Sequence, residues 1–167
     1  RVVNDTLLTG YRITNGWAKC NYTYFAISLS KPIKDYGYRD MKRVKYRGFM
    51  GKLRLHENFP EISGRDIVAY FNFDNATSQE LVVKGALSGV STDGALKNLR
   101  AEAAGKSFEQ IYAETDNRWN EELDAVECKG TPDQMTMLYT SLYHTMINTS
   151  IYMDVDHQYR GLDGNIH

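Results

Sequence analysis

Residues 1 to about 90 show the alternation of apolar and polar positions that is typical of β-strands. The clearest example is the stretch 21–30, which is rich in aromatic and β-branched residues. Its side chains alternate between two faces of a strand, with Tyr22, Tyr24, Ala26 and Ser28 on one face and Thr23, Phe25, Ile27 and Leu29 on the other. We expect the second set to face a core.

Further stretches before residue 90 also predict strands, separated by turns. Pro32 and Gly37 are expected to break the first run, and the basic stretch 39–54 is interpreted as a weak strand flanked by exposed loops. The stretch 67–73 alternates again. The apolar run 81–90 contains Gly85 and Gly89, which indicate a bulge or a close backbone approach. Successive strands with short turns predict an antiparallel β-sandwich.

After residue 90 the apolar positions recur at helical spacing, with recognisable helix starts. The three predicted helices run from the cluster 91–93 to Gly105, from the capping box 107–110 to about residue 125, and from Thr131 with Pro132 at its first position to about residue 148. Strands and helices in separate blocks predict the α+β class, and the pattern leaves open whether they form one domain or two.

Composition and charge narrow the classes of function. The sequence has 42% hydrophobic and 25% charged residues, which is typical of a globular protein with a core. A formal net charge of -1 gives no electrostatic reason to expect nucleic acid or an anionic membrane as a partner. No stretch approaches the roughly 20 apolar residues that a membrane helix needs. Cys20 and Cys128 are far apart and are interpreted as free, partly buried thiols rather than a disulfide or metal ligands.

Several short strings occur in a characteristic order along the chain. They are Gly16-Trp17, Asn21-Tyr-Thr-Tyr-Phe-Ala-Ile, Ser30-Lys-Pro-Ile, Val90-Ser-Thr-Asp-Gly-Ala-Leu-Lys-Asn-Leu, Trp119-Asn-Glu-Glu-Leu, Tyr139-Thr-Ser-Leu-Tyr-His-Thr-Met-Ile, Tyr152-Met-Asp-Val-Asp and Tyr159-Arg-Gly-Leu-Asp. Each string alone is weak evidence. As an ordered set, from about Gly10 to the end, they resemble glycoside hydrolase family 92, the calcium-dependent, inverting exo-α-mannosidases.

The resemblance implies an architecture that agrees with the strand and helix pattern. Residues 1–90 would be part of an N-terminal β-sandwich domain, 91–130 a helical linker, and 131–167 the start of an (α/α)₆ catalytic barrel with its first helix. We therefore expect the sequence to be an internal fragment of a longer enzyme. The N-x-S/T triplets at Asn4, Asn21, Asn75 and Asn148 fit a secreted protein, and we expect a secreted or periplasmic location with the signal peptide outside this span.

The resemblance also implies a reaction, the removal of a terminal α-linked mannose with inversion. An inverting glycosidase needs a carboxylic acid and a carboxylate roughly 6.5–9.5 Å apart, so that a water molecule fits between base and sugar. Ca²⁺ is expected to hold sugar hydroxyls in the parent enzyme. We expect the catalytic pair and the calcium ligands downstream of these residues, so the span alone is expected to be inactive. The expected substrates are α-mannosides of the N-glycan or mannan type.

Candidate substrate-binding residues lie in the polar segment after the third predicted helix, because such a loop in an (α/α)₆ barrel often lies near the mouth of the active site. They are Asp154, Asp156, Arg160, Asp163 and His167. For Asp154 and Asp156, loop capping or another structural role is the favoured alternative to catalysis. Plain loop residues are the favoured alternative for the other three.

Other chemistry-bearing residues have simpler interpretations. His144 is expected to be an ordinary helix residue rather than a general base. Trp119 is expected to be a core residue and Trp17 a sandwich-packing residue, with stacking on a sugar face as the alternative for both. The basic run from Lys42 to Arg54 is interpreted as a solvated edge or loop. Two rival functions stay open: a non-catalytic carbohydrate-binding or structural β-sandwich module, and a sandwich of another (α/α)₆ hydrolase or phosphorylase.

Overall fold

The computed structural model describes residues 1–16, 20–40, 60–65, 67–74, 80–148 and 151–167. Trp17, the sequon at Asn75, the basic run from Lys42 to Arg54 and most of the predicted weak strand at 39–54 lie outside the described residues.

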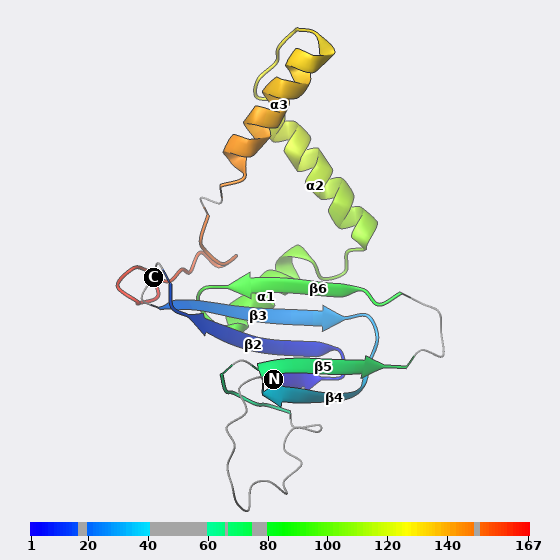
Figure 1. Cartoon of the computed structure of the whole chain (residues 1–167), viewed down its shortest axis with the longest axis vertical. Helices are drawn as coiled ribbons and strands as arrows, with labels where there is room; N and C mark the ends of the chain where they lie inside the picture. The colour runs from blue at the N-terminus through cyan, green and yellow to red at the C-terminus, as the bar shows by residue number, and fades with distance from the viewer. Residues whose placement is uncertain (17–19, 41–59, 66, 75–79, 149–150) are drawn as a thin grey trace, which may run out of the picture.

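The described part of the chain forms two antiparallel sheets followed by helices, which confirms the α+β class (Figure 1). The strands are β1 Val2–Asn4, β2 Leu7–Thr14, β3 Asn21–Leu29, β4 Ile33–Asp40, β5 Ile67–Phe73 and β6 Val83–Ser88. One sheet has the order β1-β2-β3-β6, and β4 pairs with β5 in the other. The expected break at Gly37 is wrong, because β4 runs through this glycine and pairs it with Tyr70.

The buried core lies mainly on the face of β3 that was not expected to carry it. Ala26 is fully buried and packs with Ala95 and Leu99 of α1, the helix Thr92–Glu102. Ala26 belongs to the set with Tyr22 and Tyr24, and its small side chain lets the helix lie close to the sheet. On the opposite face Leu29 is buried as predicted, whereas Phe25 and Ile27 are only half-buried.

The three helices begin where the capping signals place them. The Ser91 hydroxyl accepts a hydrogen bond from Gly94 N at the start of α1. Reciprocal capping boxes begin the other two helices, α2 Phe108–Leu123 and α3 Pro132–Met146. Such caps satisfy amides that the first helical turn leaves unpaired. The predicted ends of α2 and α3 are two residues too late.

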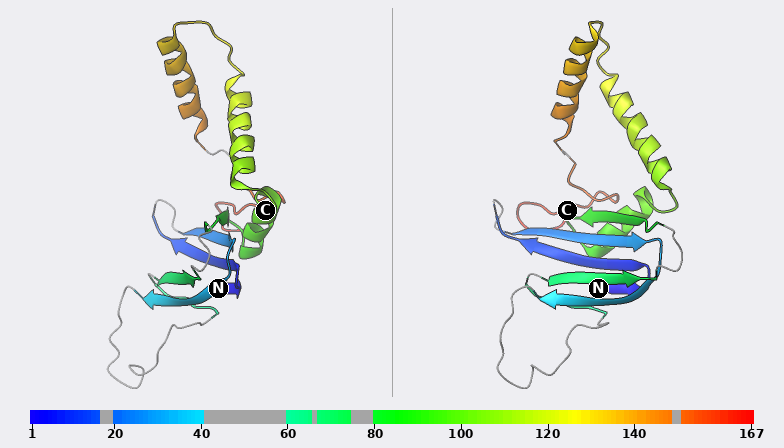
Figure 2. Two further views of the ribbon diagram at one scale, coloured as in Figure 1. Left: turned by 90° about the vertical axis from the view of Figure 1, so that its right-hand side faces the viewer. Right: turned by 45° about the vertical axis from the view of Figure 1, so that its right-hand side comes forward.

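Helices α2 and α3 form a hairpin that projects away from the sheets (Figures 1 and 2). Trp119 of α2 packs on Tyr143 of α3, with ring centroids 4.7 Å apart, and the Tyr139 hydroxyl donates to Val126 O at 3.0 Å. Neither helix has a buried residue, so Trp119 is half-buried rather than part of a core. His144 is an exposed helix residue beside Tyr143, as predicted. Among the described residues, no helix is long and apolar enough to span a membrane.

Candidate functional site

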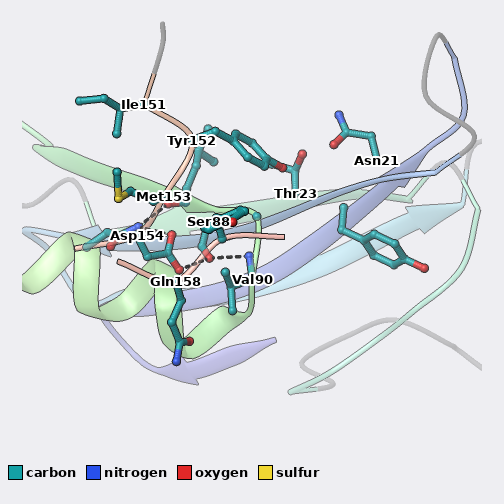
Figure 3. A pocket seen from close by; sticks show the side chains of 14 residues that line it. Asn21, Thr23, Ser88, Val90, Ile151, Tyr152, Met153, Asp154 and Gln158 are labelled. Carbon is teal, nitrogen blue, oxygen red and sulfur yellow. Dashed lines mark hydrogen bonds between the residues drawn. The ribbon is translucent and has the colours of Figure 1, made fainter. Parts of the chain in front are cut away.

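The side chain of Asp154 is buried beside the end of β6, although aspartate is usually exposed. Its Oδ2 accepts a hydrogen bond from Ser88 Oγ at 2.6 Å, and its Oδ1 accepts one from Asn98 Nδ2 at 2.9 Å. Figure 3 shows the Ser88 hydroxyl between the Asp154 carboxylate and the Val90 amide. Asp154 therefore anchors the segment that follows α3 onto the junction of β6 and α1.

The partners of Asp154 are themselves fully bonded. Ser88 Oγ accepts hydrogen bonds from Val90 N at 2.9 Å and from Ser91 N at 3.2 Å. Asn98 Nδ2 also donates to Leu87 O at 2.8 Å, and its Oδ1 accepts from Val155 N at 3.0 Å. In the part of the chain that the structure describes, no buried side-chain nitrogen or oxygen lacks a partner. A satisfied polar network of this kind holds one conformation strongly.

Gly94, in the first turn of α1, leaves room for this network. A Cβ atom at this position would overlap Asp154 Oδ2 and would lie 2.7 Å from Ser88 Oγ. Any other residue here would therefore displace the carboxylate or the hydroxyl.

Asp156 binds the same segment to α1 from the solvent side. Lys97 Nζ lies 2.6 Å from Asp156 Oδ2, and both side chains are partly exposed. The hydrogen bond from Lys97 lowers the pKa of Asp156 and raises that of Lys97. Both aspartates of the predicted pair therefore make structural contacts, but on different sides of the segment.

Arg160 links the C-terminal segment to the sheet. Its Nε donates to Gly89 O at 2.9 Å, its Nη2 donates to Val90 O at 3.0 Å, and its Nη1 donates to Gly164 O at 3.0 Å. The guanidinium carbon also lies 4.6 Å from the centre of the Tyr22 ring on β3. The guanidinium is thus held by three carbonyl groups and one aromatic ring.

Residues 159–167 form a small hairpin, which we call the terminal hairpin. Tyr159 N donates to His167 O at 3.0 Å and His167 N donates back to Tyr159 O at 2.9 Å. Gly161 N donates to Asn165 O at 2.8 Å, and Gly164 has a positive φ of 82° in the turn, which glycine adopts without strain. The rings of Tyr159 and His167 stack with centroids 5.4 Å apart. The hairpin therefore has a defined internal structure.

Asp163 lies in the turn of the terminal hairpin with its carboxylate partly exposed. It accepts hydrogen bonds from Asn165 N at 3.0 Å and from Asn165 Nδ2 at 2.8 Å, and His167 Nε2 lies 3.2 Å from its Oδ1. The hydrogen bonds from Asn165 and then that from His167 lower the pKa of Asp163. About half of each side chain of the Asp163–His167 pair remains exposed, at 49% and 47%, so both can meet a ligand.

The lowered pKa of Asp163 predicts that the stability of the terminal hairpin depends on pH. Ionised Asp163 should stabilise the hairpin above its ordinary pKa of 3.8, and this stabilisation should be lost as the pH falls from 3.8 through the lower folded value. Asp163→Asn, which cannot ionise, should remove this dependence. The check is a carboxyl NMR titration with amide exchange of residues 159–167. A folded pKa of Asp163 at or above its ordinary value would contradict the prediction.

A cleft of about 310 Å³ lies between the anchored segment and the end of the sheet (Figure 3). Its lining mixes hydroxyl, amide and aromatic side chains with apolar ones, a composition that suits a polar ligand with apolar faces. The polar and aromatic contributors are Asn21, Tyr22, Thr23, Ser88, Asn98, Tyr152, Asp154, Gln158 and Tyr159. Of the five predicted substrate-binding residues, Asp154 alone lines this cleft.

The five predicted residues thus fall into two groups. Asp154 and Asp156 lie before the terminal hairpin and bind Ser88, Asn98 and Lys97. Arg160, Asp163 and His167 belong to the hairpin, and of these Asp163 and His167 face each other at its surface. Their role in substrate binding stays a prediction. Sequence reasoning missed Ser88, Asn98 and Gly94, although a glycine in a first helical turn is a poor helix former and could have indicated a close approach.

The described residues offer no ready metal site. No group of three or more His, Cys, Asp or Glu side chains among them could hold a metal ion. The donors that Ca²⁺ prefers are oxygen atoms, and the carboxylates of Asp154 and Asp156 are occupied by hydrogen bonds. Within the described ranges, these carboxylates are therefore not arranged as a calcium site. Cys20 and Cys128 are free, as predicted, but both are exposed rather than partly buried.

Comparison with protein families defines the class of protein. Residues 1–88 match the glycosyl hydrolase family 92 N-terminal domain, and residues 94–167 match the glycosyl hydrolase family 92 catalytic domain. The first match ends with β6 and the second begins in the first turn of α1, and the hydrogen bond from Ser88 to Asp154 joins the two matched parts. The division of residues 91–167 into a linker and a first barrel helix stays a prediction. No curated protein matches the chain.

Solved structures give the same assignment. The family GH92 α-mannosidase BT3965 from Bacteroides thetaiotaomicron matches 100% of the chain with 31% identity and a TM-score of 0.84, over 22% of its own chain. Its complex with mannoimidazole matches 100% of the chain with 32% identity and a TM-score of 0.83, over 21% of that chain. The family GH92 inverting mannosidase BT2199 from the same organism matches 98% with 25% identity and a TM-score of 0.79, over 22% of its chain. The chain thus spans about a fifth of these relatives, and it belongs to glycoside hydrolase family 92.

Proposed function

We propose that this chain is part of a calcium-dependent exo-α-mannosidase that removes terminal α-linked mannose with inversion. The main support is that matches to both domains of the family cover nearly the whole chain in the family's order. BT3965 is an α-mannosidase and has also been solved in complex with mannoimidazole, and BT2199 is an inverting mannosidase. A secreted or periplasmic location is part of the proposal.

In this proposal, the chain supplies binding groups rather than the reacting carboxyl groups. The half-exposed side chains of Asp163 and His167 would accept hydrogen bonds from sugar hydroxyls and donate hydrogen bonds to them. The catalytic acid and base, which inversion requires to be roughly 6.5–9.5 Å apart, and the calcium ligands are expected outside these 167 residues.

The test is a mannose-release assay on the complete product of the gene, with α-1,2-mannobiose as substrate, in calcium and in a chelator. We expect release that depends on calcium, and NMR should show β-mannose as the first product. Release of α-mannose would refute inversion, and equal rates with the chelator would refute the calcium dependence. Mannose binding without release from any α-mannoside would favour a non-catalytic carbohydrate-binding module. Release of a different sugar would favour another hydrolase or phosphorylase.

A further inference from the structure

We propose that Tyr22 is a positioning residue for the terminal hairpin and, through it, for the sugar that Asp163 and His167 contact. The proposal rests on the proposed function for its link to substrate. Its structural part, that the ring of Tyr22 fixes the orientation of the hairpin, stands on the observed contacts alone.

The contact between Tyr22 and Arg160 joins distant parts of the chain. Tyr22 lies on β3, within the match to the N-terminal domain, and Arg160 lies within the match to the catalytic domain. The guanidinium carbon is 4.6 Å from the centre of the Tyr22 ring. A cation at this distance from an aromatic face is attracted by the negative potential of the ring, and a planar guanidinium can stack on it.

Arg160 has little freedom to compensate if the ring is removed. Its Nε and Nη2 donate to the consecutive carbonyl groups of Gly89 and Val90, and its Nη1 donates to Gly164 O inside the hairpin. The planar guanidinium of Arg160 therefore joins the end of β6 to the turn of the terminal hairpin. Because hydrogen bonds to carbonyl groups act along the guanidinium plane, the Tyr22 ring adds a restraint on movement out of that plane.

The hairpin transmits this orientation to the candidate binding groups. Its two ends are paired through Tyr159 and His167, and its turn is bonded through Gly161, Asn165 and Asp163. A hairpin with these internal bonds is expected to move as one body. A change in the tilt of Arg160 should therefore displace both Asp163 and His167, without breaking the pair that they form with each other.

The ring matters for function because catalysis is sensitive to small displacements. A misplacement of about 1 Å in a group that orients the substrate can lower the rate by roughly 100-fold. Loss of the Tyr22 ring should thus lower kcat/KM while the free energy of unfolding changes little. The buried network around Asp154 still holds the segment to the fold.

The experiment compares three variants of the complete gene product in mannose release and in hydrogen–deuterium exchange of residues 159–167. Tyr22→Leu removes the ring, and Tyr22→Phe keeps the ring and removes the hydroxyl. Tyr11→Leu is the matched control, because Tyr11 is 54% exposed on the neighbouring strand and its ring neighbour is Tyr24. We expect Tyr22→Leu to lower kcat/KM by roughly 10- to 100-fold and to speed exchange in the hairpin. Tyr22→Phe and Tyr11→Leu should both keep kcat/KM and the hairpin exchange rate close to those of the wild type.

Equal effects of Tyr22→Leu and Tyr22→Phe, or of Tyr22→Leu and Tyr11→Leu, would overturn the proposal. If Tyr22→Leu does not fold, Arg160→Lys replaces it, because it keeps the charge and loses the planar fork. Faster hairpin exchange with lowered kcat/KM in Arg160→Lys would support the proposal, and unchanged exchange would overturn it. A wild-type protein that releases no mannose refutes the proposed function instead. The exchange data then still decide whether the ring positions the hairpin.

Discussion

Asp154→Ala is expected to destabilise the chain by about 3 kcal/mol, because two buried donors lose their acceptor at once. The Ser88 hydroxyl and the Asn98 amide both donate to this carboxylate. A buried polar group left without a partner costs roughly 1–3 kcal/mol. Asp154→Asn keeps the volume and one acceptor oxygen but turns an NH₂ group towards one of the two donors, so we expect a smaller loss. Urea unfolding followed by circular dichroism measures both changes.

The matched control for this prediction is Asp156→Ala, two residues further along the chain. Asp156 forms an ion pair with Lys97, and both side chains are in contact with solvent. Exposed ion pairs contribute little to folding because water and salt screen them. We therefore expect Asp156→Ala to unfold at nearly the same urea concentration as the wild type. A loss as large as that of Asp154→Ala would mean that the buried network is not what holds this segment.

Gly94→Ala is expected to lower stability by roughly 1–3 kcal/mol, the usual cost of overpacking. The sign is informative, since in an ordinary helix alanine is favoured over glycine by about 1 kcal/mol. Here the added Cβ would overlap Asp154 Oδ2 and crowd Ser88 Oγ at 2.7 Å. The carboxylate cannot move away without losing its own hydrogen bonds. Thermal and urea unfolding of the variant check the prediction.

Gly85→Ala, in β6, is the comparison for Gly94→Ala. An added Cβ at Gly85 would meet no heavy atom within 4 Å. Glycine in a strand interior costs roughly 0.5–1 kcal/mol relative to alanine, so this variant should be neutral or slightly stabilising. The explanation from the buried network fails if Gly94→Ala is as stable as Gly85→Ala.

Much of the fold could be predicted from local sequence patterns. The capping boxes at Ser107 and Thr131 act between residues three apart, so their sequence signals suffice to place the starts of α2 and α3. The choice of the core face of β3 failed because it depends on α1, which is distant in sequence. Side-chain size alone favours Phe25 and Ile27, whereas the helix packs on Ala26. The break assigned to Gly37 failed because pairing with β5 outweighs the local weakness of glycine in a strand.

The candidate site was less predictable because its contacts join distant residues. The polar segment with Asp154, Asp156 and Asp163 is visible in the sequence, but its partners are not. Ser88 and Asp154 are 66 positions apart, and Arg160 is 71 positions from Gly89. Neither pair belongs to a short motif, so no spacing rule could have joined them.

The buried Asp154 network also closes a long loop of the chain that contains α2 and α3, and we call this loop the detour. The polypeptide leaves the sheet after α1, makes the helical hairpin, and returns so that Asp154 lies against Asn98 of α1. The entropic free-energy cost of closing a flexible loop grows slowly with its length, by about 0.6 kcal/mol for each doubling. The connection between α2 and α3 lies at the far end of this detour (Figure 2). Insertions there should be tolerated during evolution, because they leave the hydrogen bonds from Ser88 and Asn98 to Asp154 unchanged.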